Sequence, residues 1–230
     1  MVKKLALFVE GQTEAIFARR LIEEIGGVNG IQFEEVESRG SGTLSLSGES
    51  PTRDFFVLIA NCHNDERVKS AVLEHRPSLI SRGYSMIIGL RDLFPSPMAD
   101  LEKVKSRLRC RIPTAGARTE IVLAVTEVEA WFLQDHTHFA RIHLGLDVNS
   151  FKTQFGFDPQ QDCAETIPNP AQTLHSIYSS VGLAYKKKKN HVNRTADAID
   201  FASLYFSDPL KIPHFRMFSS LIDEFLVSTA

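Results

Sequence analysis

The sequence predicts an α/β fold with a largely parallel central sheet flanked by helices, followed by a mainly helical C-terminal region. Four apolar runs have the length of a buried strand: residues 5–9, 55–60, 86–90 and 121–125. Amphipathic helical patterns separate these runs, as is typical of strands that lie parallel in one sheet. Strand signals end after the fourth run, so we expect residues 1–143 to form an α/β core and residues 144–230 a helical region packed on it.

The composition indicates a folded protein without a membrane span. The 230 residues are 43% hydrophobic, which is enough to bury a sizeable core. The formal net charge of −2 provides no overall attraction to nucleic acid, so any such binding must come from a local basic patch. Three cysteines without a Cys-x-x-Cys pair favour free thiols in a reducing cytoplasm. No apolar segment approaches membrane-spanning length, and we therefore expect a cytoplasmic protein.

The first apolar run ends in an acid. Residues 5–9 lead into Glu10 and Gly11, and a helical pattern begins within three residues. In a parallel sheet Glu10 would lie at the carboxyl end of its strand, where open α/β sheets bind ligands, and Glu14 would follow on the first helical turn. The alternative is that a Glu at a helix start only caps the helix or is favoured by its dipole.

The next segments predict a helix end, a strand and a loop. Gly26 and Gly27 end the first helix, and polar residues alternate with apolar ones in a second strand over residues 31–37. Residues 38–51 are rich in Gly and Ser, which predicts a long surface loop. This loop is either a lid beside the carboxyl edge of the sheet, where a ligand would bind, or a plain connector.

The third apolar run also ends in an acid. Residues 86–90, which follow a predicted helix over residues 65–81, lead into Asp92. Asp92 therefore repeats the position of Glu10, and the two acids are expected in one site. The alternative is an ion pair between Asp92 and Arg91 or another arginine. A further helix is predicted over residues 100–108.

The fourth run leads into two more acids. Glu127 is expected to close the strand over residues 121–125, and Glu129 to open the next helix. Trp131 lies in an apolar cluster and is interpreted as a core residue rather than a base-stacking platform. His138 has a His-x-His spacing with the histidine before it, but a place in a solvated loop is favoured over metal binding.

The C-terminal region carries a strongly basic run. Residues 151–157 predict a short linking segment, and helices are predicted over residues 171–180 and 196–204 and from residue 213 onward. The run could contact phosphates with salt-sensitive, sequence-independent affinity. A merely solvated loop is the alternative. Its candidate nucleic-acid-binding residues are Lys186, Lys187, Lys188, Lys189 and Arg194.

Three stretches resemble one bacterial family. Glu-Gly-Gln-Thr-Glu at residues 10–14 is similar to the opening motif of Toprim-like proteins, and in particular of the family of unknown function designated DUF4276. Residues 92–95 and 127–135 resemble later motifs of that family in the same order. The resemblance implies a Toprim-like fold, divalent-metal binding and a partner ATPase in a bacterial defence system. Toprim domains carry Asp-x-Asp where this chain has Asp92, Leu93 and Phe94, so the second Asp is absent.

Acids at the ends of three predicted strands indicate a site for Mg2+ or Mn2+, which take oxygen ligands and polarise phosphoryl groups. We therefore expect metal-dependent phosphodiester hydrolysis on nucleic acid, as in a Toprim-type nuclease. The alternative is a non-catalytic binding or accessory module, and the sequence does not distinguish DNA from RNA. The expected catalytic residues are Glu10, Asp92 and Glu127, and the expected metal ligands are Glu10, Glu14, Asp92, Glu127 and Glu129.

Overall fold

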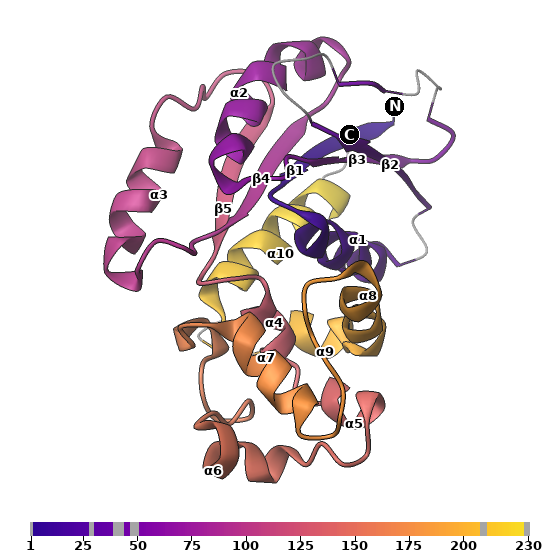
Figure 1. Ribbon diagram of the computed structural model, residues 1–230. Helices are drawn as coiled ribbons and strands as arrows, with labels where there is room; N and C mark the ends of the chain where they lie inside the picture. Colours follow the sequence, from indigo (N-terminus) through magenta and orange to yellow (C-terminus); the bar gives the residue numbers. More distant parts are fainter. Residues whose placement is uncertain (1, 28–29, 39–43, 47–50, 208–210, 228–230) are drawn as a thin grey trace.

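The centre of this protein is a five-stranded sheet in the order β2-β3-β1-β4-β5 (Figure 1). The computed structural model describes residues 2–27, 30–38, 44–46, 51–207 and 211–227. Every pair of neighbouring strands is parallel, which confirms the predicted α/β fold. The strands are β1 (Lys3–Val9), β2 (Ile31–Glu37), β3 (Phe55–Asn61), β4 (Met86–Asp92) and β5 (Arg118–Ala124).

Both faces of the sheet are buried, which explains why its central strands are apolar without alternation. Side chains of β1 alternate between two separate core clusters: Leu5, Leu7 and Val9 enter one, and Ala6 and Phe8 the other. Helices cover both faces (Figure 1). The first face carries α1 (Gln12–Gly26) and α10 (Pro213–Val227), and the second carries α2 (Asp65–Ser81) and α3 (Leu101–Arg109).

The other helices lie beyond the carboxyl edge of the sheet, in the lower half of Figure 1. They are α4 (Glu129–Gln134), α5 (His138–Ile142), α6 (Phe151–Phe155), α7 (Pro170–Ser179), α8 (Lys189–Ala198) and α9 (Phe201–Tyr205), with single 3-10 turns at Met98–Asp100, Val148–Ser150 and Ala164–Thr166. The largest core cluster runs from the sheet into these helices without interruption. Trp131 lies in it, fully buried against the rings of Phe17, Phe215 and Phe218, so its interpretation as a core residue is confirmed.

Glu165 joins α10 to the helical region. This buried carboxylate accepts hydrogen bonds from the indole N–H of Trp131 and from the backbone N–H of Phe215, at 3.0 and 3.1 Å. Its other oxygen lies 2.8 Å from Nδ1 of His214. The acid therefore satisfies free amides in the first turn of α10, where negative charge is favoured by the helix dipole.

Two predictions for the C-terminal region are wrong. The helix predicted over residues 196–204 is two helices. The first, α8, begins earlier, at Lys189, and ends at Ala198, and α9 begins after Asp200. The carboxylate of Asp200 accepts the N–H of Ser203 and so begins α9 as a new helix. Residues 151–157, predicted as a linking segment, contain α6.

The Gly- and Ser-rich segment falls mostly outside the described residues, so its role as a lid or connector stays a prediction. Within the part that is described, Leu44 is buried with Phe56 and Leu58 in the core of the second face. This segment therefore contributes at least one side chain to the core.

Candidate metal site at the carboxyl edge

Three strand ends bring acids to one edge of the sheet. Glu10 directly follows β1, and Asp92 is the last residue of β4. Asp92 pairs in register with Ala124, the end of β5, and Glu127 lies three residues further on rather than closing the strand as predicted. The backbone N–H of Asp92 donates to Oε2 of Glu10 at 3.0 Å, which joins two of the predicted site residues directly.

Asp92, Glu127 and Glu129 form a carboxylate triad. Each offers one oxygen within 4.8 Å of the other two, and in the part of the chain that the structure describes this is the only such group of His, Cys, Asp or Glu. The three residues are 4%, 8% and 0% exposed. The structure thus brings together three of the five predicted metal ligands in an environment where unpaired charge is costly.

One oxygen of each triad carboxylate is held by a donor from the protein. The bonds are Val128 N–H to Asp92 Oδ1 (3.0 Å), Ala171 N–H to Glu127 Oε2 (3.1 Å) and Tyr185 O–H to Glu129 Oε1 (2.8 Å). Ala171 provides the first N–H of α7, because the helix begins with Pro170. These bonds orient the carboxylates and leave the other oxygen of each one directed at a common neighbour.

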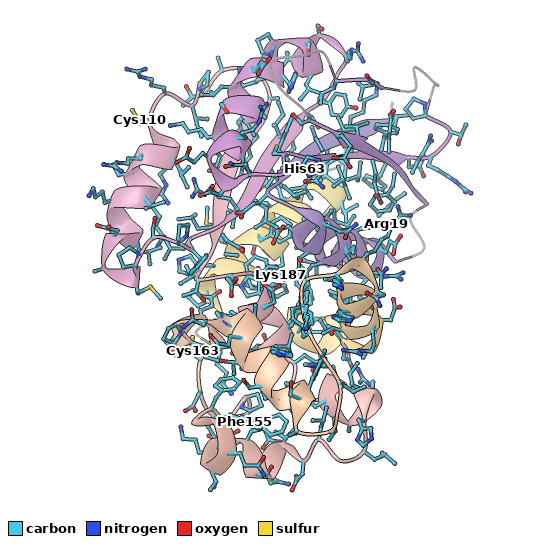
Figure 2. All side chains as sticks on the ribbon, viewed as in Figure 1. Arg19, His63, Cys110, Phe155, Cys163 and Lys187 are labelled. Atoms are coloured by element: carbon cyan, nitrogen blue, oxygen red, sulfur yellow. The ribbon has the colours of Figure 1, made fainter. Side chains whose placement is uncertain are left out.

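That neighbour is Lys187, which Figure 2 shows where the sheet meets the C-terminal helices. Its ammonium lies 2.9 Å from Glu127 Oε1, 3.1 Å from Glu129 Oε2 and 3.8 Å from Asp92 Oδ2. The side chain as a whole is 39% exposed, so the stem reaches solvent while the ammonium faces the triad. The nearby carboxylates raise the pKa of Lys187 against the opposing effect of burial.

The backbone around Lys187 is held in an unusual conformation. Lys187 has a φ of 48°, in the left-handed region that costs a residue with a side chain about 1–2 kcal/mol. Bonds on either side hold the loop: Arg194 donates to the carbonyl of Ala184 at 2.6 Å, and the N–H of Lys186 donates to Nδ1 of His191 at 3.1 Å. The inward position of Lys187 is therefore supported by the whole turn between α7 and α8.

The site holds more acidic groups than basic ones. Burial, then Glu14 and Glu129, raise the pKa of Asp92 well above its ordinary value. Burial also raises the pKa of Glu129, although Lys187 opposes the shift. One ammonium among several buried acids leaves the site short of positive charge, a deficit that a divalent cation would remove.

Glu14 and Glu10 lie beside the triad rather than in it. Glu14 is 3% exposed on the first turn of α1, and burial together with Glu129 and Glu10 raises its pKa to about 7. Glu10 is only partly buried; burial raises its pKa, and the hydrogen bond from Asp92 opposes the shift. The predicted five-acid site is therefore a compact triad with two flanking acids.

The alternative in which Asp92 pairs with Arg91 is wrong. The guanidinium of Arg91 lies 2.7 Å from the carboxylate of Asp65, which follows β3, and reaches only the backbone carbonyl of Asp92. The side chain of Asp92 turns to Val128 and Lys187 instead. The carboxylate of Asp92 is therefore directed into the site and forms no ion pair with the neighbouring Arg91.

The triad fits a hard divalent cation. Around one octahedral Mg2+, neighbouring oxygens lie about 3 Å apart and opposite oxygens about 4.2 Å apart, so the triad oxygens, which lie within 4.8 Å of one another, would have to move closer together to bind one ion. No donor in the described residues meets Glu129 Oε2 with hydrogen-bond geometry, although Lys187 lies 3.1 Å from it. The buried carboxylate of Glu165, by contrast, has both oxygens satisfied inside the protein. The triad therefore differs from an acid with a structural role.

The basic residues divide into two groups. Lys187 faces the triad, and Arg194 stacks over the ring of Tyr178 with its carbon Cζ 5.2 Å from the ring centre. The side chains of Lys186, Lys188 and Lys189 are exposed. Phosphate contact by all five stays a prediction, and the three exposed lysines are the ones positioned to reach a partner without rearrangement.

Three roles in this region differ from what the sequence indicated. His138 is fully buried rather than solvated: Nδ1 donates to the carbonyl of Asp135, and Nε2 lies 3.1 Å from the hydroxyl of Tyr178. Tyr185 and Lys187 contact the triad, although neither was assigned to the metal site. The only sequence signal in this turn was the run of four lysines. Nothing in the run distinguishes Lys187 from the lysines on either side of it.

No family model, curated protein or solved structure matches this chain. Among the described residues, no helix combines the length and apolar character that crossing a membrane requires.

Proposed function

We propose that this protein is a metal-dependent phosphodiesterase that acts on nucleic acid. The observation that carries the proposal is the carboxylate triad, in which three buried acids direct one oxygen each at a single point on the carboxyl edge. An all-oxygen donor set suits Mg2+ or Mn2+. Such an ion would polarise the phosphoryl group and lower the pKa of an attacking water.

Two further side chains have a chemical part in this proposal. If a divalent ion neutralised the triad, the ammonium of Lys187 would become available to a phosphate oxygen, where positive charge would stabilise the charge that develops in phosphoryl transfer. Glu10 has one oxygen fixed by the N–H of Asp92 and is partly exposed, so its other oxygen can hold a water beside the triad.

A non-catalytic accessory module is the second candidate, and one observation favours it. Lys187 already pairs with Glu127 and Glu129, so the acids could serve only to fasten the turn between α7 and α8. The absent second acid after Asp92 points the same way. This alternative also accommodates the partner ATPase that the resemblance to the DUF4276 family implies.

A cleavage assay decides between the two. Purified protein is incubated with labelled single-stranded and duplex DNA and RNA, with Mg2+, with Mn2+ and with a chelator. We expect metal-dependent cleavage by the wild type, and its loss in Glu129→Gln, which keeps an acceptor for Tyr185. The matched control is Glu102→Gln, which removes one exposed acid from α3.

Three results would overturn the nuclease proposal: no cleavage of any substrate by the wild type, cleavage that persists in the chelator, or equal cleavage by Glu129→Gln. Melting curves of each variant establish that a loss of cleavage does not reflect a loss of folded protein.

A further inference from the structure

A concave feature is formed by loops that adjoin the triad residues. It is a pocket of about 440 Å³, within the range of pockets that bind small organic groups. Its wall is formed by the loop that follows Asp92 and by parts of two neighbouring loops: Phe94, Pro95, Pro97, Met98, Thr126 and Pro168.

The pocket and the triad share their supports. Phe94 is two residues from Asp92, so their Cα atoms are at most about 7 Å apart. The N–H of Phe94 donates to the carbonyl of Thr126 at 2.9 Å, and Thr126 directly precedes Glu127. The loops that line the pocket are therefore continuous with the segments that carry Asp92 and Glu127.

The other wall of the pocket is tied to the triad as well. The hydroxyl of Thr126 donates to the carbonyl of Ile167 at 2.9 Å, next to Pro168 of the pocket. Four residues further along this loop, the N–H of Ala171 donates to Glu127. The segment that closes the pocket thus also orients a triad carboxylate.

Two large apolar side chains of the pocket are open to solvent. Phe94 is 49% exposed and Met98 42% exposed, while most large apolar side chains in the described residues are buried. Prolines at positions 95 and 97 restrict the backbone that follows Phe94, so this part of the loop has little backbone freedom to lose on binding. An exposed aromatic ring near the proposed metal site is suited to stack on a planar ring.

We propose that this pocket is a nucleobase subsite in which a base of the substrate stacks on Phe94 while its phosphate lies at the triad. The inference rests on the proposed function and narrows it. A base can reach Phe94 only when it is outside a duplex, so the substrate is single-stranded, frayed or flipped at the position of cleavage. The occupant is one planar aromatic group covalently attached to a phosphate.

Binding without cleavage tests the subsite separately from the reaction. Fluorescence anisotropy in a chelator, and again with Ca2+, measures binding of labelled single-stranded 12-mers, of the same strands as duplexes, and of strands in which every base is replaced by an abasic site. The variants are Phe94→Ala and Phe94→Trp. The matched control is Phe206→Ala, which removes an 81% exposed ring elsewhere on the surface.

We expect Phe94→Ala to weaken single-strand binding about 5- to 150-fold, the loss that removing one base–aromatic stack causes. Phe94→Trp should restore it, and Phe206→Ala should leave it unchanged. Strands without bases should bind wild type and Phe94→Ala equally. Duplexes should bind wild type more weakly than single strands.

The outcomes separate the two proposals. If single strands bind Phe94→Ala as tightly as wild type, the subsite is overturned whether or not the protein cleaves, and this result would also fit a pocket that a partner protein covers. If base-dependent binding is lost in Phe94→Ala but no metal supports cleavage, the subsite stands and the phosphodiesterase proposal falls. If no nucleic acid binds at all, both proposals fall.

Discussion

The ammonium of Lys187 lies 2.9 Å from Oε1 of Glu127, at the end of a side chain whose backbone has a φ of 48°. A left-handed lysine is uncommon, and its conformational cost persists only where the surroundings determine it. Here the surroundings are buried carboxylates that need a cation. The relationship makes Lys187 the internal counter-ion of the triad and leads to the first prediction.

Replacing Lys187 with Met should destabilise the protein at pH 7.5 by about 1–3 kcal/mol. Removing one partner of a fully buried pair costs about 3–5 kcal/mol, and the 39% exposure of Lys187 lowers that figure through solvent screening. Urea unfolding measures the effect. Lys188→Met is the matched control, because it changes an exposed lysine one residue away. Equal unfolding free energies for the two variants would remove Lys187 from the role of counter-ion.

Mn2+ should raise the melting temperature of the wild type. An ion that binds only the folded state contributes about 2.7 kcal/mol at a hundred times its Kd, which for a chain of this size corresponds to about 5–10 °C. Glu129→Gln should lose most of this shift, and Glu102→Gln should keep it. Differential scanning calorimetry in Mn2+ and in chelator gives the comparison. A shift of the same size in Glu129→Gln would exclude the triad as the metal site.

Stability should fall as the pH rises from about 4.5 to 7, in part because of Glu14. Its pKa is raised to about 7 in the folded state, so between these values the folded protein binds a proton that the unfolded chain has released. The contribution is fully present below pH 4.5 and is lost by pH 7, and it amounts to ~3 kcal/mol.

Glu14→Gln should therefore show a shallower decline of unfolding free energy over that range in chelator. Mn2+ should reduce the decline in the wild type, because a cation favours the charged acid. Parallel pH profiles for wild type and variant would contradict this account of Glu14.

His138 should have the opposite effect over an overlapping range. Burial lowers its pKa to about 4, so the unfolded chain takes up a proton below pH 6.5 that the folded protein does not bind until pH 4. Stability contributed by neutral His138 is present above pH 6.5 and is lost as the pH falls to 4. Nitrogen NMR should show that the imidazole ring is neutral at pH 5.5. Its single N–H proton should be on Nδ1, which donates to the carbonyl of Asp135. A ring that is charged at that pH would contradict the prediction.

The exposed lysines should set the salt dependence of nucleic-acid binding. Replacing Lys186, Lys188 and Lys189 together with Ala removes up to three phosphate contacts. The slope of log affinity against log salt should then decrease in magnitude by about 0.7 per lost contact on single strands, with similar weakening for every sequence. Anisotropy titrations from low to moderate salt measure the slope.

The control for that prediction changes lysines outside the turn between α7 and α8. Lys103 and Lys152 are exposed and each pairs with a nearby aspartate, so a double alanine variant alters net charge without touching the proposed contact. The change of salt slope per lysine replaced is compared between this variant and the variant of the lysine run. If the two changes are equal, overall charge rather than the lysine run determines binding.

Local sequence determined the sheet and its acids. A strand that has helices on both faces is apolar along its length, because polar side chains are excluded until the strand reaches the edge of the sheet. An apolar run followed by an acid therefore indicates a buried strand whose carboxyl end lies at that edge. The predicted positions of Glu10, Asp92 and Glu129 at the starts of loops or helices follow from this rule. The acid nature of the site could therefore be found from composition and spacing alone.

The tertiary structure decided how the acids are arranged and what neutralises them. Lys187 and Tyr185 lie more than fifty residues from Glu129, and only the packing of α7 against α4 and of α8 against α1 and α5 brings them to it. The same packing makes His138 a buried residue, since its Tyr178 partner comes from α7. Long-range contacts of this kind leave no periodic signal in the sequence, because each depends on a single side chain and on the path of the intervening chain.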